Sequence, residues 1–326
     1  MITILFQLVL SLQPVLVQGI VNGQDAPMSP PFFGTIYSLK KLYSSSTPSF
    51  EVPHCGATFL DWSTAVTAAH CASLNLADDP VLVMNHPEAE VTKESLGKES
   101  VIVMNITQSI FHPRFNMSEK TPVPGGSHFS FDVAVLKLAQ RSGPLLTAES
   151  KFVQLDNVQK PDAWAFTRLQ VVGMGMSKLD NPTTLMGGNA YPKTLQQSSY
   201  VVESESKCDV AYQDYKSGNA TASFCVGVDP NGSGICQGDS GSPLYYPSSP
   251  DYSQQARALK LPTLVGITSW HIGECGKSVE VFTQVSHPEV YSFIQAHSNS
   301  KPGVVQEPFV VLPPWAVEQQ KGKTVV

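Results

Sequence analysis

A serine, a histidine and an aspartate stand in three short motifs whose composition suits nucleophilic catalysis. Ser240 lies in the turn sequence Gly-Asp-Ser-Gly of residues 238–241, His70 ends the run Thr-Ala-Ala-His of residues 67–70, and Asp132 precedes the run Val-Ala-Val-Leu. A single residue of any of these types is usually structural. Three such motifs in the order His, Asp, Ser, with cysteines nearby, indicate a hydrolytic triad.

The chemistry of such a set is acyl transfer to a hydroxyl group. Ser240 Oγ would attack a carbonyl carbon, and His70 would take the hydroxyl proton and later return it to the leaving group. Asp132 would orient the imidazole and stabilise its protonated form. The backbone N–H groups of Gly238 and Ser240 would form the oxyanion hole, and a glycine at 238 suits the tight turn that this requires.

These motifs resemble those of the chymotrypsin/trypsin family of secreted serine proteases (peptidase S1 type), and the resemblance extends from Ile20 to about His297. It implies an all-β fold with two six-stranded antiparallel β-barrels, a C-terminal helix and an active site between the barrels. The first barrel would hold His70 and Asp132, and the second would hold Ser240 and the specificity pocket.

Composition and hydrophobic pattern favour the same fold class. Glycine and proline are plentiful, at 23 and 25 residues, and short apolar runs rich in β-branched residues alternate with turn sequences. The clearest expected strands lie at residues 56–60, 101–106, 133–138, 169–173 and 264–270. Residues 288–296 carry apolar side chains on one helical face, which predicts a C-terminal helix. Enlarged loops are expected at residues 77–100, 117–130, 177–193 and 246–262.

Six cysteines, an even number in a chain with a secretory leader, predict three disulfides. Spacing alone leaves fifteen pairings open. The resemblance implies one of them, namely Cys55–Cys71, Cys208–Cys225 and Cys236–Cys275. No Cys-x-x-Cys pair or Cys/His cluster has the spacing of zinc ligands, so we expect no metal site. We also expect no cofactor.

Three segments are expected along the chain: a signal peptide at residues 1–19, a protease domain at 20–297 and a Pro-containing tail at 298–326. The leader is mostly apolar, ends in small residues, and is too short and interrupted to favour a membrane anchor. A secreted, extracellular protein is therefore expected. Four Asn-x-Ser/Thr sequences predict some glycosylation, at Asn105, Asn116, Asn219 and Asn231.

The charge balance limits the class of partner. A formal net charge of -6 and a pI near 5.7 argue against nucleic acid. The resemblance implies protein or peptide substrates and protein inhibitors of proteases as partners. We expect a monomer that has no membrane attachment once the signal peptide is removed.

Activation is expected to depend on Ile20 and Asp239. In the family that the chain resembles, a new N-terminal isoleucine folds inward and pairs with the aspartate before the nucleophile, and a basic residue usually precedes the cut. Here Gly19 precedes Ile20, and the leader has no Lys or Arg. We therefore expect signal peptidase itself, or removal of a very short pro-piece, to expose Ile20.

The specificity pocket leaves two interpretations open. Its expected residues are Gly234, Ile235, Ser269, Trp270, His271 and Glu280. Gly234 stands where trypsin-like members carry an aspartate that pairs with Lys or Arg, so that determinant is absent. An inward Glu280 would favour a mixed specificity that includes basic residues. If instead His271 narrows the entrance or pairs with Glu280, a short pocket for small apolar residues is expected, and a slip in the alignment would leave Glu280 facing solvent.

Three function classes are compatible with these motifs. The first is an active endopeptidase, and the second is a binding or inhibitor protein built on the protease fold but without catalysis. Proteins of the second class usually lack a triad member, and none is missing here. An esterase using the same residues is the third. Two departures, Met174 for a usual tryptophan and Ser242 for a usual glycine, remove no catalytic group.

Overall fold

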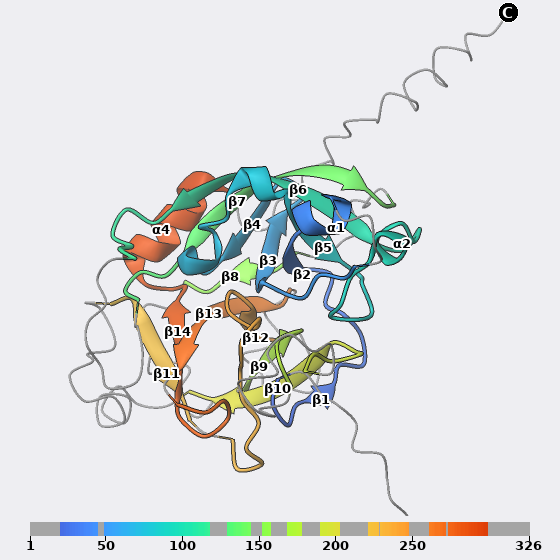
Figure 1. Cartoon of the computed structure of the whole chain (residues 1–326). Helices are drawn as coiled ribbons and strands as arrows, with labels where there is room; N and C mark the ends of the chain where they lie inside the picture. The colour runs from blue at the N-terminus through green and yellow to red at the C-terminus, as the bar shows by residue number, and fades with distance from the viewer. Residues whose placement is uncertain are drawn as a thin grey trace, which may run out of the picture.

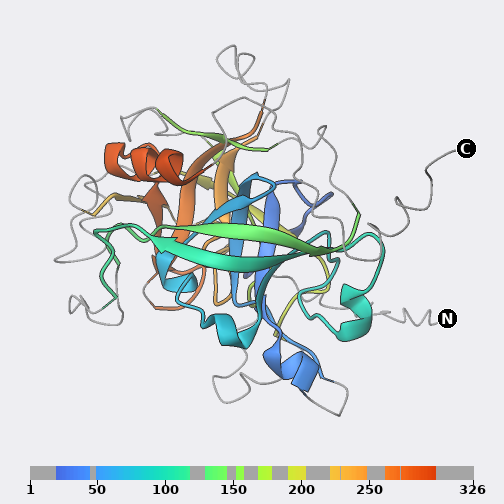
Figure 2. The same ribbon diagram turned by 90° about the horizontal axis from the view of Figure 1, so that it is seen from above.

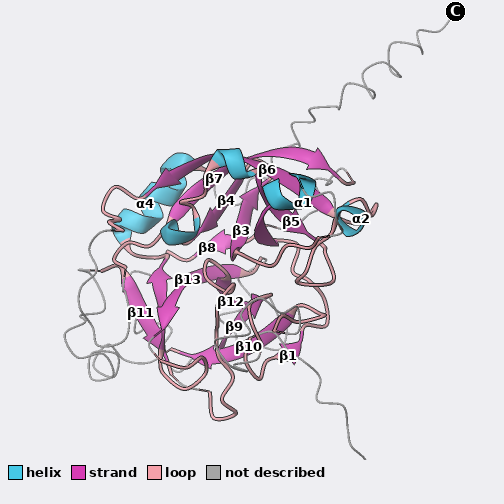
Figure 3. Ribbon diagram, in the orientation of Figure 1, coloured by secondary structure: helices cyan, strands magenta, loops and turns pink. Residues whose placement is uncertain are grey.

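The computed structural model describes residues 20–44, 49–117, 129–144, 152–157, 168–177, 190–202, 221–227, 229–247, 261–271 and 273–298. The expected signal peptide, Cys208 and all but the first residue of the expected tail lie outside these ranges. Strands dominate the described chain, and the few helices are mostly short (Figure 3). Two strand assemblies lie one above the other in Figure 1. The described chain begins beside the lower assembly, forms the upper one, returns to form the lower one, and ends in a helix beside the upper one.

The upper assembly is a closed six-stranded barrel built from the first part of the chain. Its strands follow the order β2-β3-β4-β7-β6-β5, and each neighbouring pair is antiparallel. Their bounds are β2 (Phe33–Ser38), β3 (Cys55–Asp61), β4 (Thr64–Thr67), β5 (Pro80–Met84), β6 (Ile102–Phe111) and β7 (Ala134–Ser142). Inward-facing residues such as Phe59 and Leu82 are fully buried and fill this barrel.

The lower assembly is a second antiparallel ring, with strands in the order β10-β9-β12-β13-β14-β11. An isolated bridge between Val202 and Val226 links the end of β10 to β11 and so closes the ring. The bounds are β9 (Arg168–Gly173), β10 (Gln196–Val201), β11 (Ser223–Val226), β12 (Pro243–Tyr246), β13 (Thr263–His271) and β14 (Glu280–Gln284). Two short strands pair with members of this ring. Strand β1 (Gln24–Asp25) pairs with β10, and strand β8 (Gln154–Leu155) pairs with β13.

The one helix of more than two turns among the described residues is α4 (Pro288–His297), near the end of the described chain. Pro288 suits a first helical turn, because its missing N–H would have no partner there. Val290, Phe293 and Ile294 form the buried face, and the helix packs beside β7 of the first barrel (Figure 2). The described short helical segments are α1 (Lys40–Ser44), α2 (Lys93–Leu96) and the 3-10 turns Ala69–Cys71 and Leu76–Asp78.

The predicted all-β fold with two barrels and a C-terminal helix is confirmed, and each strand run expected from the sequence overlaps an observed strand. Of the expected enlarged loops, residues 77–100 are described and contain β5 and α2. Across the helices of the described ranges, none combines the length and the apolar character that a membrane span needs.

Candidate active site

Strand register brings His70 and Asp132 together in the first barrel. Strands β4 and β7 are antiparallel neighbours, and Thr67 at the end of β4 stands opposite Ala134 at the start of β7. His70 lies three residues after Thr67, and Asp132 lies two residues before Ala134. Both side chains therefore leave the same end of the barrel, on the side that meets the second barrel.

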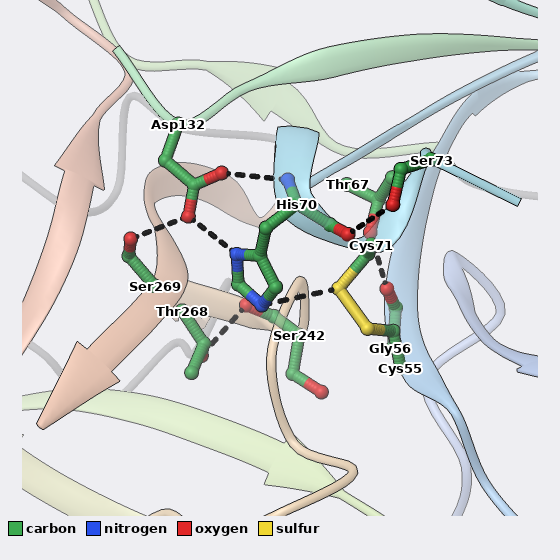
Figure 4. The surroundings of a disulfide bond; sticks show 10 residues. All are labelled: Cys55, Gly56, Thr67, His70, Cys71, Ser73, Asp132, Ser242, Thr268 and Ser269. Carbon is green, nitrogen blue, oxygen red and sulfur yellow. Dashed lines mark hydrogen bonds and ion pairs between the residues drawn. A yellow bond between two sulfur atoms is a disulfide. The ribbon is translucent and has the colours of Figure 1, made fainter. Parts of the chain in front are cut away.

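The Asp132 carboxylate is fully buried and accepts three hydrogen bonds (Figure 4). Its Oδ2 lies 2.7 Å from His70 Nδ1 and 2.6 Å from the donating Ser269 Oγ, while Oδ1 accepts from the His70 backbone N–H at 2.9 Å. Thr283 Oγ1 donates to the Asp132 carbonyl at 2.9 Å. Since Ser269 and Thr283 belong to β13 and β14, these bonds connect the two barrels.

Burial and charge act in opposite directions on this pair. Burial by itself lowers the pKa of His70, but the charge of Asp132 and the hydrogen bond to it outweigh burial and hold that pKa above its ordinary value of 6.5. Burial raises the carboxyl pKa of Asp132, yet His70 and Ser269 lower it more, so that this pKa lies below its ordinary value. The structure thus favours an ionised carboxylate beside an imidazole that protonates readily.

The turn that carries Ser240 is attached to both barrels. Gly56 N–H of β3 donates to the Ser240 carbonyl at 2.8 Å, and Gly241 N–H donates to the Thr268 carbonyl of β13 at 2.8 Å. A side chain at Gly241 has no room, because a Cβ there would lie 2.1 Å from Thr67 Oγ1. Gly241 also has a φ of +81°, which favours glycine. Ser240 is consequently held close to the strand end that leads to His70.

The hydrogen bond that a triad needs between the Ser240 hydroxyl and the His70 imidazole is not formed in this structure. Over the described ranges the Ser240 hydroxyl makes no hydrogen bond to the imidazole, and His70 Nε2 lies 3.6 Å from Cys71 Sγ (Figure 4). Such bonds are often long in a free enzyme and shorten with substrate. In the same ranges no backbone carbonyl accepts from the N–H of Gly238 or Ser240, whereas Asp239, Gly241 and Ser242 all donate to carbonyls.

The Asp239 carboxylate lies in the protein interior, where two backbone N–H groups donate to it. Oδ1 accepts from Gly175 N–H at 2.8 Å, Oδ2 accepts from Cys236 N–H at 2.9 Å, and the residue is fully buried. Burial raises the pKa of Asp239 to about 7, although the two backbone donors act to lower it. The Gly-Met-Gly sequence of residues 173–175 permits this approach, since a Cβ on Gly173 would lie 2.0 Å from Oδ1.

Ile20 is fully buried in the core of the second barrel, in a cluster that includes Ile235. Its neighbour Val21 forms a bridge with Gly234, and Gly234 N–H donates to the Val21 carbonyl at 2.9 Å. Gly19 lies outside the described residues. The segment that begins at Ile20 therefore packs along the chain that leads to Asp239 and Ser240.

Glu280 also points into the second barrel and not to solvent, with an exposed fraction of 1%. Its Oε1 accepts from Ile235 N–H at 2.7 Å. A Cβ on Gly234 would lie 2.6 Å from this oxygen and 2.2 Å from the Gly276 backbone, so no larger residue fits there. Burial raises the pKa of Glu280 well above its ordinary range, although the Tyr200 hydroxyl and Ile235 N–H lower it.

The remaining expected pocket residues lie on β13. Ser269 is the extra residue of a register shift between Thr268 and Trp270, which turns its hydroxyl to Asp132. Trp270 is buried against Cys225 and Val281. His271 stands opposite Glu280 in the strand register, and its Nε2 lies 3.5 Å from Cys275 Sγ.

Some contacts at the site had no sequence signal of their own. The ring of Phe129 stacks on the His70 imidazole, Tyr200 faces Glu280, and Thr283 bonds to the Asp132 backbone. Ser242, noted as a departure, fills space that Gly56 leaves: a Cβ on Gly56 would lie 2.2 Å from Ser242 Oγ. Each contact depends on tertiary packing between segments distant in sequence.

Two disulfides frame the site. Cys55–Cys71 lies beside His70 and Cys236–Cys275 lies beside the Ser240 turn, and these are two of the three pairs that the resemblance implies. Cys225 is also disulfide-bonded, and Cys208, its expected partner, lies outside the described residues. One group of possible metal ligands occurs in the described ranges, at Cys55, His70 and Cys71. Its two sulfur atoms are joined to each other, so it offers no thiolate.

Comparisons with known proteins give consistent matches. The family model described as Trypsin matches residues 31–294. Kallikrein-10 of Homo sapiens is 28% identical over 249 residues, which cover 74% of this chain and 70% of that protein. Kallikrein-8 of Mus musculus is 27% identical over 273 residues, 82% of each chain. Trypsin of Sus scrofa is 27% identical over 232 residues, which cover 71% of this chain and 80% of that protein.

Among solved structures, neuropsin, described as a serine protease expressed in the limbic system of mouse brain, is similar with a TM-score of 0.59. The match covers 85% of this chain and 99% of neuropsin, and the two sequences are 24% identical. At this identity the likeness concerns the fold.

Burial and the Asp132 charge shift the pKa of His70 in opposite directions, and this predicts the effect of Asp132→Asn on that pKa. The substitution removes the charge that raises the imidazole pKa and leaves burial, so we expect the pKa of His70 to fall below 6.5. NMR titration of histidine-labelled protein measures it. Ser269→Ala is the control, because it removes one hydrogen bond and keeps the charge, and there the pKa should stay above 6.5. An unchanged pKa in Asp132→Asn would contradict the electrostatic explanation.

Proposed function

Because the chain belongs to the trypsin family of serine proteases, we propose that it is a secreted serine endopeptidase in which Ser240, His70 and Asp132 form the catalytic triad. The observation that carries the proposal is the buried Asp132 carboxylate, which binds both the imidazole Nδ1 and the backbone of His70. A carboxylate held in this way fixes the tautomer and the orientation of the imidazole, and a base in acyl transfer needs both.

The proposed reaction begins with attack of Ser240 Oγ on the carbonyl carbon of the scissile peptide bond. His70 Nε2 takes the hydroxyl proton, and Asp132 stabilises the imidazolium that results. The N–H groups of Gly238 and Ser240 donate to the oxyanion. The imidazolium then protonates the leaving amine, the bond to nitrogen breaks, and an acyl-enzyme remains on Ser240. Water, activated by His70, attacks the ester and releases the acid and the free hydroxyl.

Secretion is supported by the apolar leader and by the disulfides, which persist in oxidising compartments. Protein or peptide substrates and protein inhibitors are the proposed partners, and no cofactor takes part in the proposed reaction. The active form begins at Ile20, whose new α-amino group pairs with Asp239. The contacts of Ile20 with the second barrel and the inward carboxylate of Asp239 support this step.

For specificity we propose that the enzyme accepts basic side chains together with others. A buried carboxylate without a cation is costly, and a substrate cation would compensate Glu280. Gly234 cannot supply the acid, because the Gly276 backbone occupies the space that a larger residue would need. His271, opposite Glu280, is the residue that would restrict the pocket to small side chains.

A fluorophosphonate probe tests the proposed nucleophile. We expect labelling at Ser240 in the wild type and none in Ser240→Ala. Ser240→Ala and His70→Ala should each lower kcat by several orders of magnitude, and the double variant should be scarcely worse, because the residues act as a unit. A wild type that folds but is neither labelled nor active indicates a binding protein. Full peptide hydrolysis by Ser240→Ala would refute the assignment.

The raised pKa of Asp239 predicts how stability depends on the residue before Ile20. In a chain extended by one residue, the unfolded pKa of Asp239 is 3.8 and the folded pKa is about 7. At a pH between these values Asp239 is protonated in the folded chain and ionised in the unfolded chain. The free energy of unfolding should therefore fall as the pH rises through this range, by on the order of 4 kcal/mol. In a chain that starts at Ile20 the α-ammonium group should remove most of this loss.

Thermal or urea unfolding of both chains at pH 5 and pH 8, in a Ser240→Ala background that prevents self-digestion, measures the part of this loss that falls above pH 5, about 2.7 kcal/mol in the extended chain. Asp239→Asn in the extended chain is the matched control and should flatten the pH dependence. Equal pH dependence in the extended chain and the chain that starts at Ile20 would contradict the proposed pair.

Peptide-library cleavage tests the role of Glu280. We expect cleavage after Lys or Arg in the wild type. Glu280→Gln should abolish it while cleavage after uncharged residues continues, since glutamine keeps the shape of the side chain but cannot ionise beside a substrate cation. Activity confined to sites after Ala or Val would show that the pocket is short and that Glu280 does not meet the substrate.

A further inference from the structure

We propose that Phe129 is a positioning residue for His70, whose ring covers one face of the imidazole and stabilises its protonated form. The inference rests on the proposed function, in which His70 is the base. It concerns a side chain three residues before Asp132 that belongs to none of the sequence motifs.

The geometry is that of an offset stack. The ring centroids of Phe129 and His70 lie 5.1 Å apart, and the ring planes are inclined by 18°. This separation is within the range of attractive aromatic pairs. It is also within the distance at which a cation is attracted to the negative face of an aromatic ring. When His70 takes the Ser240 proton, the imidazolium therefore has a π-face against it.

Phe129 is supported on its other sides. Its ring lies 5.8 Å from that of Phe115, and it packs against the cluster of Cys225, Trp270 and Val281. These contacts come from both barrels. Phe129 is thus part of a packed aromatic surface, and its ring is restrained where it meets His70.

One short segment delivers two groups to the imidazole. Asp132 reaches the Nδ1 edge at 2.7 Å, and Phe129 covers a face. Between them Phe131 is fully buried, has a φ of +51° and donates its N–H to the Thr221 carbonyl at 2.9 Å. A residue other than glycine in this region needs support from its surroundings. The fold of this turn therefore sets both contacts together.

The Cys55–Cys71 disulfide lies against another side of the His70 imidazole. Cys71 Sγ lies 3.6 Å from His70 Nε2, and Figure 4 shows the imidazole between Asp132 and the Cys55–Cys71 bond. Over the described ranges, the titratable groups with an electrostatic effect involving His70 are Asp132, before β7, and His54, before β3. Phe129 adds an uncharged contribution, which substitution can separate from these two.

The test is NMR titration of His70 in a Ser240→Ala background, where the result does not depend on activity. Phe129→Leu keeps this face of the imidazole covered but removes the π-system, so the pKa of His70 should fall by about half a unit. Phe129→Tyr retains an aromatic face and should stay close to the parent protein. Phe115→Leu, which changes a neighbour that does not stack on His70, is the matched control and should also stay close.

A second variant serves if Phe129→Leu does not fold. Pentafluorophenylalanine at position 129 keeps the ring shape and reverses its quadrupole, so it should lower the pKa of His70 as well. In the active background, the acid limb of kcat/KM for an ester of a single blocked amino acid should move to lower pH by the same half unit.

An unchanged or raised pKa in both the leucine and the pentafluorophenylalanine variants overturns the proposal. Failure of the proposed function is a separate result, because it appears as absence of Ser240 labelling in the wild type and leaves the titration interpretable.

Discussion

The buried carboxylate of Asp132 is the interaction on which the arrangement of the two barrels depends. A charge without solvent must be compensated by hydrogen bonds and an opposite charge, and here the donors come from both barrels. His70 belongs to the first barrel, whereas Ser269 belongs to β13 of the second. If the barrels shifted relative to each other, Asp132 would lose a donor. The stability of the interface and the orientation of the imidazole are therefore coupled.

Close backbone approach is the second constraint, and it explains the glycines around the Ser240 turn. Gly241 lets the turn lie against the first barrel, Gly56 leaves space for Ser242, and Gly173 lets the chain pass beside Asp239. In each case a single added Cβ would overlap an atom of the other segment. The turn is thus fixed by packing on two sides, which is the pre-organisation that an oxyanion hole needs.

Sequence reasoning reached the features that are local. The strands around residues 56–60 and 264–270 and the helix at 288–296 follow from apolar periodicity, and the motifs around His70 and Ser240 have distinct composition. It did not reach contacts that tertiary structure creates. Phe129 carries no signal that predicts a stack on His70. The inward orientation of Glu280 does not follow from the sequence, because a strand pattern alone does not show which face is buried. The closure of the second ring through Val202 and Val226 is likewise a long-range pairing.

In the enzyme proposed above, the Ser240 turn, the His70–Asp132 pair and the N–H groups of Gly238 and Ser240 form one reaction centre. A crystal structure of the chain that begins at Ile20, after reaction with a peptidyl phosphonate, is the decisive experiment for this reaction centre. We expect a phosphorus bond to Ser240 Oγ, with one phosphonyl oxygen about 3 Å from both N–H groups. His70 Nε2 should contact the adduct as well. A folded protein that forms no adduct, or an adduct whose oxygen is turned away from both N–H groups, would contradict the proposed reaction centre.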